Sequence, residues 1–229
     1  MPAYDVVIPA FNAERTIVAA LRSVAAQSPA PQRIIVVDDG SSDGTVDAVR
    51  RSGIDVLLLT QPNAGPGSAT SHGFAASRAA LIATLDADDV WLPDKMRRQM
   101  ALMAAEPGIA ISFTHWRHFR DADPATAGPA GPGWTRSTML ARAEAIAAIG
   151  PVVDPPGRRG EMVDWLGRAR AQGHRLQMME EVLVLRRIHA GSLSYGRDAA
   201  RDRGYLEVAR RALLRQRAAR AARDTEDGA

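Results

Sequence analysis

The chain has 229 residues, 46% of them hydrophobic, which is enough for one ordinary domain with a substantial core. Its 29 basic and 26 acidic side chains leave a net charge of +3, too small an excess to indicate a nucleic-acid partner. The absence of cysteine excludes disulfides, cysteine nucleophiles and thiolate metal sites, so carboxylates and histidine are left to bind a hard ion such as magnesium or manganese.

Strand-like and helix-like segments alternate through the first part of the chain. Short β-branched or apolar runs predict strands at 4–8, 33–37, 55–59 and 81–85. Helical patterns lie between them, at 13–27, 45–51 and from the turn at 63–67 to residue 80. This alternation predicts an α/β fold with a mostly parallel sheet and helices on both faces.

The rest of the sequence is less regular. We expect helices at 92–106, 137–149, 162–172 and about 200–222, with strands at 109–114 and 182–188. A stretch rich in proline, glycine and alanine at 121–133 predicts a surface loop.

Polar and acidic residues follow the carboxyl ends of three predicted strands. They are Pro9 to Asn12, Asp38-Asp39, and Asp86-Ala87-Asp88-Asp89. In parallel sheets a ligand binds outside these ends, where the loops converge. We therefore expect the three segments to be neighbours around one site.

The acidic cluster at 86–89 offers the oxygen ligands that a divalent ion between two phosphates needs. Taken alone, it is equally compatible with a solvated turn or a helix cap, because Trp91-Leu92-Pro93 begins a predicted helix. Its position after a fourth strand favours the metal site.

Four motifs in register resemble the family-2 glycosyltransferases of the GT-A fold. They are VVIPAFN at 6–12, VVDDGSSDGT at 36–45, NAG at 63–65 with Ala69 and Gly73, and LDADD at 85–89. The resemblance is strong over about the first ninety residues. It implies one continuous domain in three parts: a nucleotide-sugar-binding part at 1–112, a smaller and less regular acceptor-side part at 113–195, and a C-terminal basic helix and tail at 196–229.

The resemblance implies an enzyme of hexosyltransferase type. It would move a sugar with inversion from a nucleoside-diphosphate donor, expected to be UDP-linked, to an acceptor hydroxyl, with Mn²⁺ or Mg²⁺ as cofactor. The acceptor is open between a glycan, a lipid-linked molecule and a peptide. No targeting segment or membrane span is recognised, so a cytoplasmic location is the expectation.

Two other functions stay open. A non-catalytic nucleotide-binding or scaffold module would keep the fold without turnover. A sugar-phosphate nucleotidyltransferase is disfavoured because Pro9 to Asn12 is not a glycine- and arginine-rich loop.

The resemblance also assigns roles to single residues. Pro9 and Phe11 would line the base and ribose pocket, Asp39 with Asp38 would accept a hydrogen bond from the base, and Asp86 would meet the ribose or the sugar. Phe11 is equally compatible with a place in the core. The full substrate-binding set is Pro9, Ala10, Phe11, Asn12, Asp38, Asp39, Gly65, Asp86, Ala87 and Arg187, and the metal set is Asp88, Asp89 and His189.

The catalytic base has two candidates, Glu161 and Asp164. The family usually supplies the base from a Glu-Asp pair that opens a helix, and here Met162 stands where the aspartate is expected. Asp164 lies three residues after Glu161 on the same helical face. The structural alternative is that Glu161 caps the helix and Asp164 is solvated.

Two further features depart from the expected pattern. The residues before Gly73 read Ala-Thr-Ser-His instead of the family's frequent Ala-Arg-Asn, so His72 is a candidate substitute for a cationic nucleotide contact. The segment 197–223 carries many arginines around an apolar stripe. Peripheral contact with an anionic membrane is one interpretation, and packing of the stripe on the domain is the favoured one.

Overall fold

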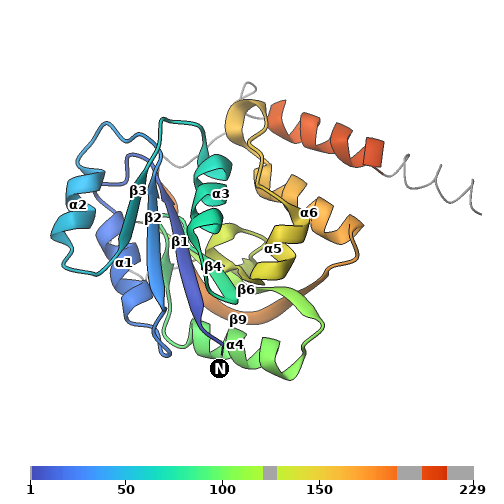
Figure 1. Cartoon of the computed structure of the whole chain (residues 1–229), viewed down its shortest axis with the longest axis horizontal. Helices are drawn as coiled ribbons and strands as arrows, with labels where there is room; N and C mark the ends of the chain where they lie inside the picture. Colours follow the sequence, from blue (N-terminus) through green and yellow to red (C-terminus); the bar gives the residue numbers. More distant parts are fainter. Residues whose placement is uncertain (1, 121–127, 190–202, 216–229) are drawn as a thin grey trace, which may run out of the picture.

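The computed structural model describes residues 2–120, 128–189 and 203–215. Within these residues nine strands form one sheet of order β3-β2-β1-β4-β8-β6-β9-β5, with β7 paired to β6. Figure 1 shows β3, β2 and β1 side by side in this sheet. The strands are β1 (Tyr4–Ala10), β2 (Arg33–Asp38), β3 (Leu57–Thr60), β4 (Leu81–Thr84), β5 (Val90–Trp91), β6 (Ile109–Phe119), β7 (Ala130–Pro132), β8 (Leu140–Arg142) and β9 (Arg175–Arg187). The helices are α1 (Ile17–Ala25), α2 (Thr45–Arg51), α3 (Pro66–Ala76), α4 (Lys95–Ala105), α5 (Ala143–Ile149) and α6 (Glu161–Ala171), with short 3-10 turns η2 (Arg136–Thr138) and η3 (Pro156–Arg158).

The first four βα units form the parallel half of the sheet, as predicted. Strand β1 pairs in parallel with β2 and β4, and β2 pairs in parallel with β3. Because these strands run in one direction, their carboxyl ends share an edge, where Ala10 lies opposite Asp38. This edge carries the candidate site.

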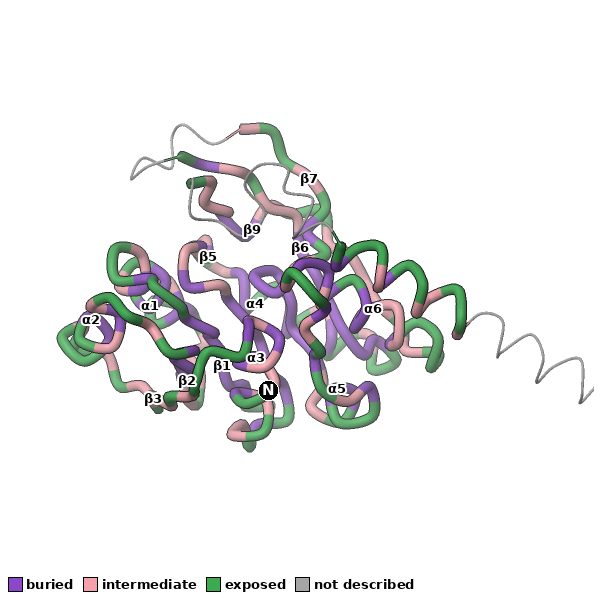
Figure 2. The backbone as a smooth tube through the Cα atoms, turned by 90° about the horizontal axis from the view of Figure 1, so that it is seen from above, coloured by how far each residue is buried: buried purple, intermediate pink, exposed green. Residues whose placement is uncertain are grey.

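Alternate residues of the strands face two separate cores. Val6 and Ile8 pack with side chains from α1, α2 and α4, whereas Val7 packs with side chains from α3, α5 and α6. Figure 1 shows α1 and α2 on one side of the sheet and α3, α5 and α6 on the other, and Figure 2 shows the buried strands between them. The predicted helices on both faces are confirmed.

The single helix predicted at 137–149 is wrong. The segment divides into the turn η2, the strand β8 and the helix α5. Strand β8 pairs antiparallel with β4 on one side and β6 on the other, and its Leu140 and Ala141 are fully buried. An apolar run that is buried on both faces suits a central strand, and its composition does not distinguish it from a helix.

The second half of the sheet is also more extensive than predicted. Strand β9 begins at Arg175 and pairs with β6 along its length, and the short β5 was not predicted at all. Residues 121–127 of the predicted loop lie outside the described residues, and β7 forms within its second half.

Residues 203–215 are helical and pack against the turn before α6. Gly204 is buried, and a Cβ added there would collide with the carbonyl oxygen of Arg159. Val208 is also buried, but Leu206, Leu213 and Leu214 are exposed to 73%, 56% and 54%. The predicted packing of the apolar stripe therefore holds for only part of it, and the remainder of the predicted helix lies outside the described residues. No helix in the described part of the chain combines the length and hydropathy needed to cross a membrane.

The only lysine of the chain, Lys95, is completely buried at the start of α4. Its Nζ donates a hydrogen bond of 2.7 Å to Gln99 Oε1 and lies 4.0 Å from the centroid of the Trp91 ring. Among the described residues no carboxylate pairs with it. Burial therefore lowers the pKa of the Lys95 ammonium well below its usual value of 10.5.

We expect Lys95→Met to flatten the dependence of the unfolding free energy on pH. Between the depressed folded-state pKa and 10.5 the unfolded chain binds the proton more strongly than the folded protein, so wild-type stability should rise with pH across this window. The Lys95 contribution is at most about 1.4 kcal/mol per pH unit, and the variant lacks it. Urea unfolding from about pH 7 to 10 measures both slopes. Equal slopes would contradict the buried, easily deprotonated lysine.

Candidate active site

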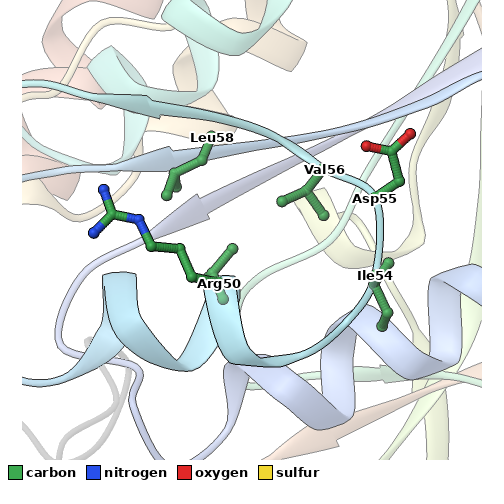
Figure 3. Close-up of a pocket in the computed structure, with 6 residues that line it drawn as sticks. Arg50, Ile54, Asp55, Val56 and Leu58 are labelled. Carbon is green, nitrogen blue, oxygen red and sulfur yellow. The ribbon is translucent and has the colours of Figure 1, made fainter.

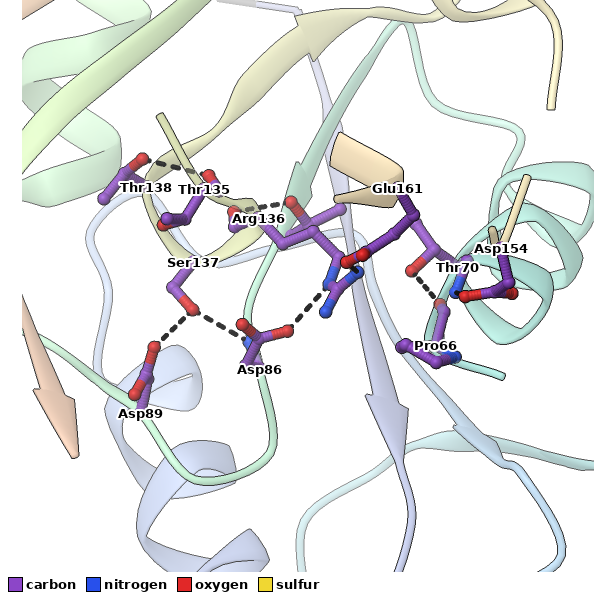
Figure 4. A network of polar contacts seen from close by, with 12 residues as sticks. Pro66, Thr70, Asp86, Asp89, Thr135, Arg136, Ser137, Thr138, Asp154 and Glu161 are labelled. Carbon is purple, nitrogen blue, oxygen red and sulfur yellow. Dashed lines mark hydrogen bonds and ion pairs between the residues drawn. The ribbon is translucent and has the colours of Figure 1, made fainter. Parts of the chain in front are cut away.

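The three carboxylates after β4 point to three different partners. Asp86 accepts a hydrogen bond of 2.7 Å from Arg136 Nε (Figure 4). Asp88 lies 3.0 Å from His189, between Oδ2 and Nε2. Asp89 accepts a hydrogen bond of 2.6 Å from Ser137 Oγ. The cluster is therefore not one solvated turn, and its members occupy distinct environments.

Asp89 is the inward member of the cluster. It is 3% exposed, and its second oxygen accepts the backbone N–H of Arg187 at 2.9 Å. Burial, followed by the charges of Asp88 and Asp86, raises the pKa of Asp89 well above its ordinary value, although its two hydrogen bonds act in the opposite direction. Both oxygens hold protein groups, so Asp89 braces the cluster against η2 and β9.

Asp88 and His189 are the outward pair. Their side chains are exposed to 29% and 42%, and His189 follows the end of β9, which pairs with β5 directly after the cluster. Arg187 joins the same contact, since its Nε donates to the carbonyl oxygen of Asp88 at 3.0 Å. The segment after β9 and the acidic cluster thus meet in space, as the resemblance implies.

A divalent ion fits this pair by its chemistry. Among the described residues no group of three or more histidine or acidic side chains forms a complete protein cage. Magnesium and similar ions bound with a nucleotide often take only one or two protein ligands, and phosphate oxygens and water supply the others. Asp88 and His189 offer one carboxylate and one imidazole, which suits such a shared site.

The end of β1 divides into buried and exposed parts. Pro9 and Ala10 are buried, and Phe11 and Asn12 are exposed. The 51% exposure of Phe11 excludes its place as a core filler in this structure, which leaves the ring available to a ligand. Asn12, with a positive φ of 49°, accepts the backbone N–H of Ser42 at 2.9 Å, so it joins the β1 and β2 loops.

The two aspartates after β2 differ in how they are used. Asp39 accepts hydrogen bonds from Ala64 N at 2.8 Å, Gly65 N at 2.9 Å and Gln61 Nε2 at 2.8 Å. A carboxylate has about four acceptor positions, so this carboxylate has little capacity left for a base. Asp38 Oδ2 accepts one N–H, while its buried Oδ1 has no hydrogen-bond partner in the described part of the chain.

A carboxylate that is distant in the sequence caps the N-terminus of α3. Asp154 accepts the backbone N–H groups of Gly67 and Ser68 at 2.9 and 2.8 Å. A Cβ at Gly65 would lie 2.6 Å from the Asp154 carboxyl carbon, which explains glycine at the cap. His72, the expected substitute for a cation, lies 3.0 Å from Gln61 Oε1 through its Nδ1, and Gln61 in turn donates to Asp39.

The two candidate bases lie in different surroundings. Glu161 begins α6 and accepts a hydrogen bond of 2.7 Å from Arg136 Nη1, which joins it to the acidic cluster. Asp164 is 3% exposed and is bound by Arg168 at 3.3 Å and by Arg215 of the terminal helix at 2.9 Å. Met162 packs in the core. Although the spacing predicts one helical face for both carboxylates, only Glu161 contacts the site.

Sequence reasoning missed four side chains that organise the site, namely Gln61, Arg136, Ser137 and Asp154. Arg136 and Ser137 stood at the edge of a segment interpreted as a helix, and Asp154 stood in an irregular connection. The only signal was the polar run Thr135 to Thr138 before an apolar segment, which is weak. Ala87, named as a substrate contact, is 7% exposed and packs in the core.

A hollow of about 350 Å³ lies elsewhere on the molecule (Figure 3). It is lined by Val49 and Arg50 of α2 and by Ile54, Asp55, Val56 and Leu58 around the amino end of β3. The strand-end site lies at the carboxyl ends of the parallel strands, so this hollow is not part of it.

Comparison with known proteins points to one family. Residues 5–146 match the model of glycosyl transferase family 2. The UDP-Glc:alpha-D-GlcNAc-diphosphoundecaprenol beta-1,3-glucosyltransferase WfgD of Escherichia coli is 35% identical over 101 residues, which are 43% of this chain and 40% of that protein. The aligned region covers between 29% and 46% of four such relatives.

Solved structures share the fold at low sequence identity. S. aureus TarS 1-349 in complex with UDP-GlcNAc has a TM-score of 0.74 and 16% identity, covering 93% of this chain and 66% of that one. The mannosyltransferase PcManGT from Pyrobaculum calidifontis, in complex with GDP-Man and Mn²⁺, has a TM-score of 0.66 and 16% identity, covering 84% and 59%. The expected GT-A fold is confirmed.

Proposed function

Because the chain belongs to glycosyl transferase family 2, we propose that it transfers a sugar from a nucleoside-diphosphate donor to an acceptor hydroxyl. The proposal rests on two contacts at the carboxyl end of β4. Asp88 contacts His189, and the neighbouring Asp86 is joined to Glu161 through Arg136. One end of this group suits a diphosphate with a metal ion, and the other suits a proton acceptor.

The donor is proposed to be UDP-linked. TarS is solved with UDP-GlcNAc and the E. coli relative is named for UDP-Glc, whereas PcManGT is solved with GDP-Man, so the same fold accepts a second base in another protein. In this chain the exposed Phe11 ring is the main group proposed to receive the base. The one acceptor position that three N–H groups leave open on Asp39 is proposed to accept a hydrogen bond from it. Asp86 is proposed to meet the sugar or ribose.

Asp88 and His189 are proposed to hold Mn²⁺ or Mg²⁺, and Asp89 is proposed to brace them. When bound, such an ion stabilises negative charge on a leaving diphosphate. PcManGT is solved with Mn²⁺, which supports this part of the proposal.

Glu161 is proposed as the base of an inverting transfer. The acceptor oxygen forms a bond to the anomeric carbon while the bond from that carbon to the diphosphate oxygen breaks. The hydroxyl proton passes to the Glu161 carboxylate, and the nucleoside diphosphate leaves with the electron pair. Attack from the face opposite the leaving group inverts the configuration.

The acceptor is proposed to be lipid-linked. The exposed leucines of the helix at 203–215 lie among arginines at 203, 210, 211 and 215, and the E. coli relative is named for a diphosphoundecaprenol substrate. An apolar face bordered by arginine fits the interface of an anionic bilayer. We propose that this helix rests on a membrane surface, and the cytoplasmic location stays a prediction.

We expect Asp88→Asn to weaken manganese-dependent binding of UDP by at least about tenfold, because one of two charged or basic ligands is lost. Isothermal titration of the protein with UDP, with and without Mn²⁺, measures the effect. Asp47→Asn is the control, since Asp47 is exposed on α2, and it should bind UDP as the wild type does. If the wild type binds no UDP, or if Asp88→Asn binds it unchanged, the donor site is wrong.

We expect Glu161→Gln to lower kcat for UDP release from UDP-glucose or UDP-GlcNAc by about 100-fold or more, with UDP affinity preserved. Asp164→Asn is the matched control. It removes the charge of a carboxylate that Arg168 of α6 and Arg215 of the terminal helix bind. It should therefore lower the melting temperature and leave kcat within about threefold of the wild type. The reverse pattern would assign the base to Asp164. Binding without turnover in the wild type would favour the non-catalytic alternative.

We expect the triple variant L206S/L213S/L214S to bind vesicles at least about tenfold more weakly than the wild type, because three exposed apolar side chains are removed. Flotation with phosphatidylcholine vesicles containing about 30% phosphatidylglycerol measures binding. Leu57→Ser, at an exposed leucine of β3, is the control and should bind as the wild type does. Absence of wild-type binding overturns the proposal, and a leucine-dependent dimer would identify a second copy as the partner instead.

A further inference from the structure

Arg136 links two carboxylates that come from opposite sides of the site. Its Nε donates to Asp86 Oδ1 and its Nη1 donates to Glu161 Oε1, each at 2.7 Å (Figure 4). Asp86 follows β4 and Glu161 begins α6, so the guanidinium is the direct connection between the donor-side cluster and the acceptor-side helix. The arginine side chain is only 8% exposed.

The charge of this bridge is stable. Burial by itself lowers the pKa of the Arg136 guanidinium, but the charges of Asp86 and Glu161 outweigh burial and leave that pKa raised above its ordinary value. Arginine therefore keeps its charge throughout the pH range of the folded protein. Two short charge-assisted hydrogen bonds from one planar group also fix the direction of each carboxylate.

The backbone that carries Arg136 is held by buried hydrogen bonds. The carbonyl oxygen of Arg136 accepts Thr84 Oγ1 at 2.6 Å, and that of Ser137 accepts Trp91 Nε1 at 2.7 Å. The carbonyl oxygen of Thr138 accepts Gln99 Nε2 at 3.0 Å. These contacts tie η2 to β4, β5 and α4, so the guanidinium cannot shift without breaking interactions in the core.

We infer that Arg136 is a positioning residue, which holds the Glu161 carboxylate in a fixed relation to Asp86 and so to the anomeric carbon of the donor. The inference rests on the proposed function, because it gives Glu161 the role of base. Arg136 acts on turnover through Glu161 and contributes little to the binding of the nucleotide. A displaced base costs rate even when the substrate is bound, because proton transfer requires hydrogen-bonding distance.

The test compares Arg136→Met and Arg136→Lys with the wild type, using UDP release from UDP-glucose and UDP-GlcNAc for turnover and titration with UDP and Mn²⁺ for binding. Arg136→Met should lower kcat by about 100-fold and change the affinity for UDP by less than about threefold. Arg136→Lys should have a kcat about tenfold higher than Arg136→Met, since the lysine ammonium can still reach one of the two carboxylates.

Arg142→Met is the matched control for loss of a partly buried arginine. Arg142 donates to the carbonyl oxygens of Ile109 and Met103 and contacts no carboxylate in the described part of the chain. The Arg142→Met substitution should lower the melting temperature, while kcat stays within about threefold of the wild type. If Arg136→Met does not fold, Arg136→Lys alone tests the inference: its kcat should fall while its affinity for UDP is preserved.

The outcomes separate the inference from the proposed function. A wild type that neither binds UDP nor releases it from either nucleotide sugar contradicts the proposed function itself. If the wild type turns over, three results overturn the positioning role alone. Arg136→Met keeps kcat, or it loses UDP affinity as strongly as kcat, or Arg136→Lys has no higher kcat than Arg136→Met.

Discussion

Two carboxylates follow β4, of which Asp89 is buried and Asp86 is 29% exposed, and the turn η2 supplies a hydrogen-bond partner to each. Arg136 neutralises Asp86, and Ser137 binds Asp89. The Arg136 side chain is 8% exposed, and leaving such a buried charge without its carboxylate partners costs about 3–5 kcal/mol, so the turn is held where Arg136 reaches them. Strand β8, which follows directly, inserts between β4 and β6 and fixes the turn in the sheet.

This constraint divides the acidic cluster into separate tasks. Because Arg136 binds Asp86, and Ser137 and the Arg187 backbone bind Asp89, Asp88 is the cluster member whose carboxylate contacts His189. The arginine that neutralises Asp86 also extends to Glu161, so the cluster after β4 and the start of α6 are connected through one planar cation. Asp164 is excluded from this arrangement, because Arg168 and Arg215 use it to attach the terminal helix to α6.

The sequence predicted the parallel half of the fold and the meeting of its strand ends, because alternation of short apolar runs with helical segments has few topological solutions. It also named Asp86, Asp88, His189 and Glu161, which the structure brings to one edge of the sheet. It did not find β8, since a buried strand of three residues shows no period that distinguishes it from a helix. Arg136 and Asp154 were missed for a related reason: each acts on residues far away in the sequence, and local patterns carry no information about such pairs.

We propose that the cluster is divided: Asp88 and His189 face the nucleotide, while the bridge from Asp86 through Arg136 to Glu161 directs the base. A crystal structure of the protein grown with UDP and Mn²⁺, measured at the manganese absorption edge, tests it most directly. We expect an anomalous peak bonded to Asp88 and His189, with Asp89 still hydrogen-bonded to Ser137 and Glu161 still bound to Arg136. A peak bonded to Asp89, or an Arg136 that leaves Glu161 when the nucleotide binds, would contradict it.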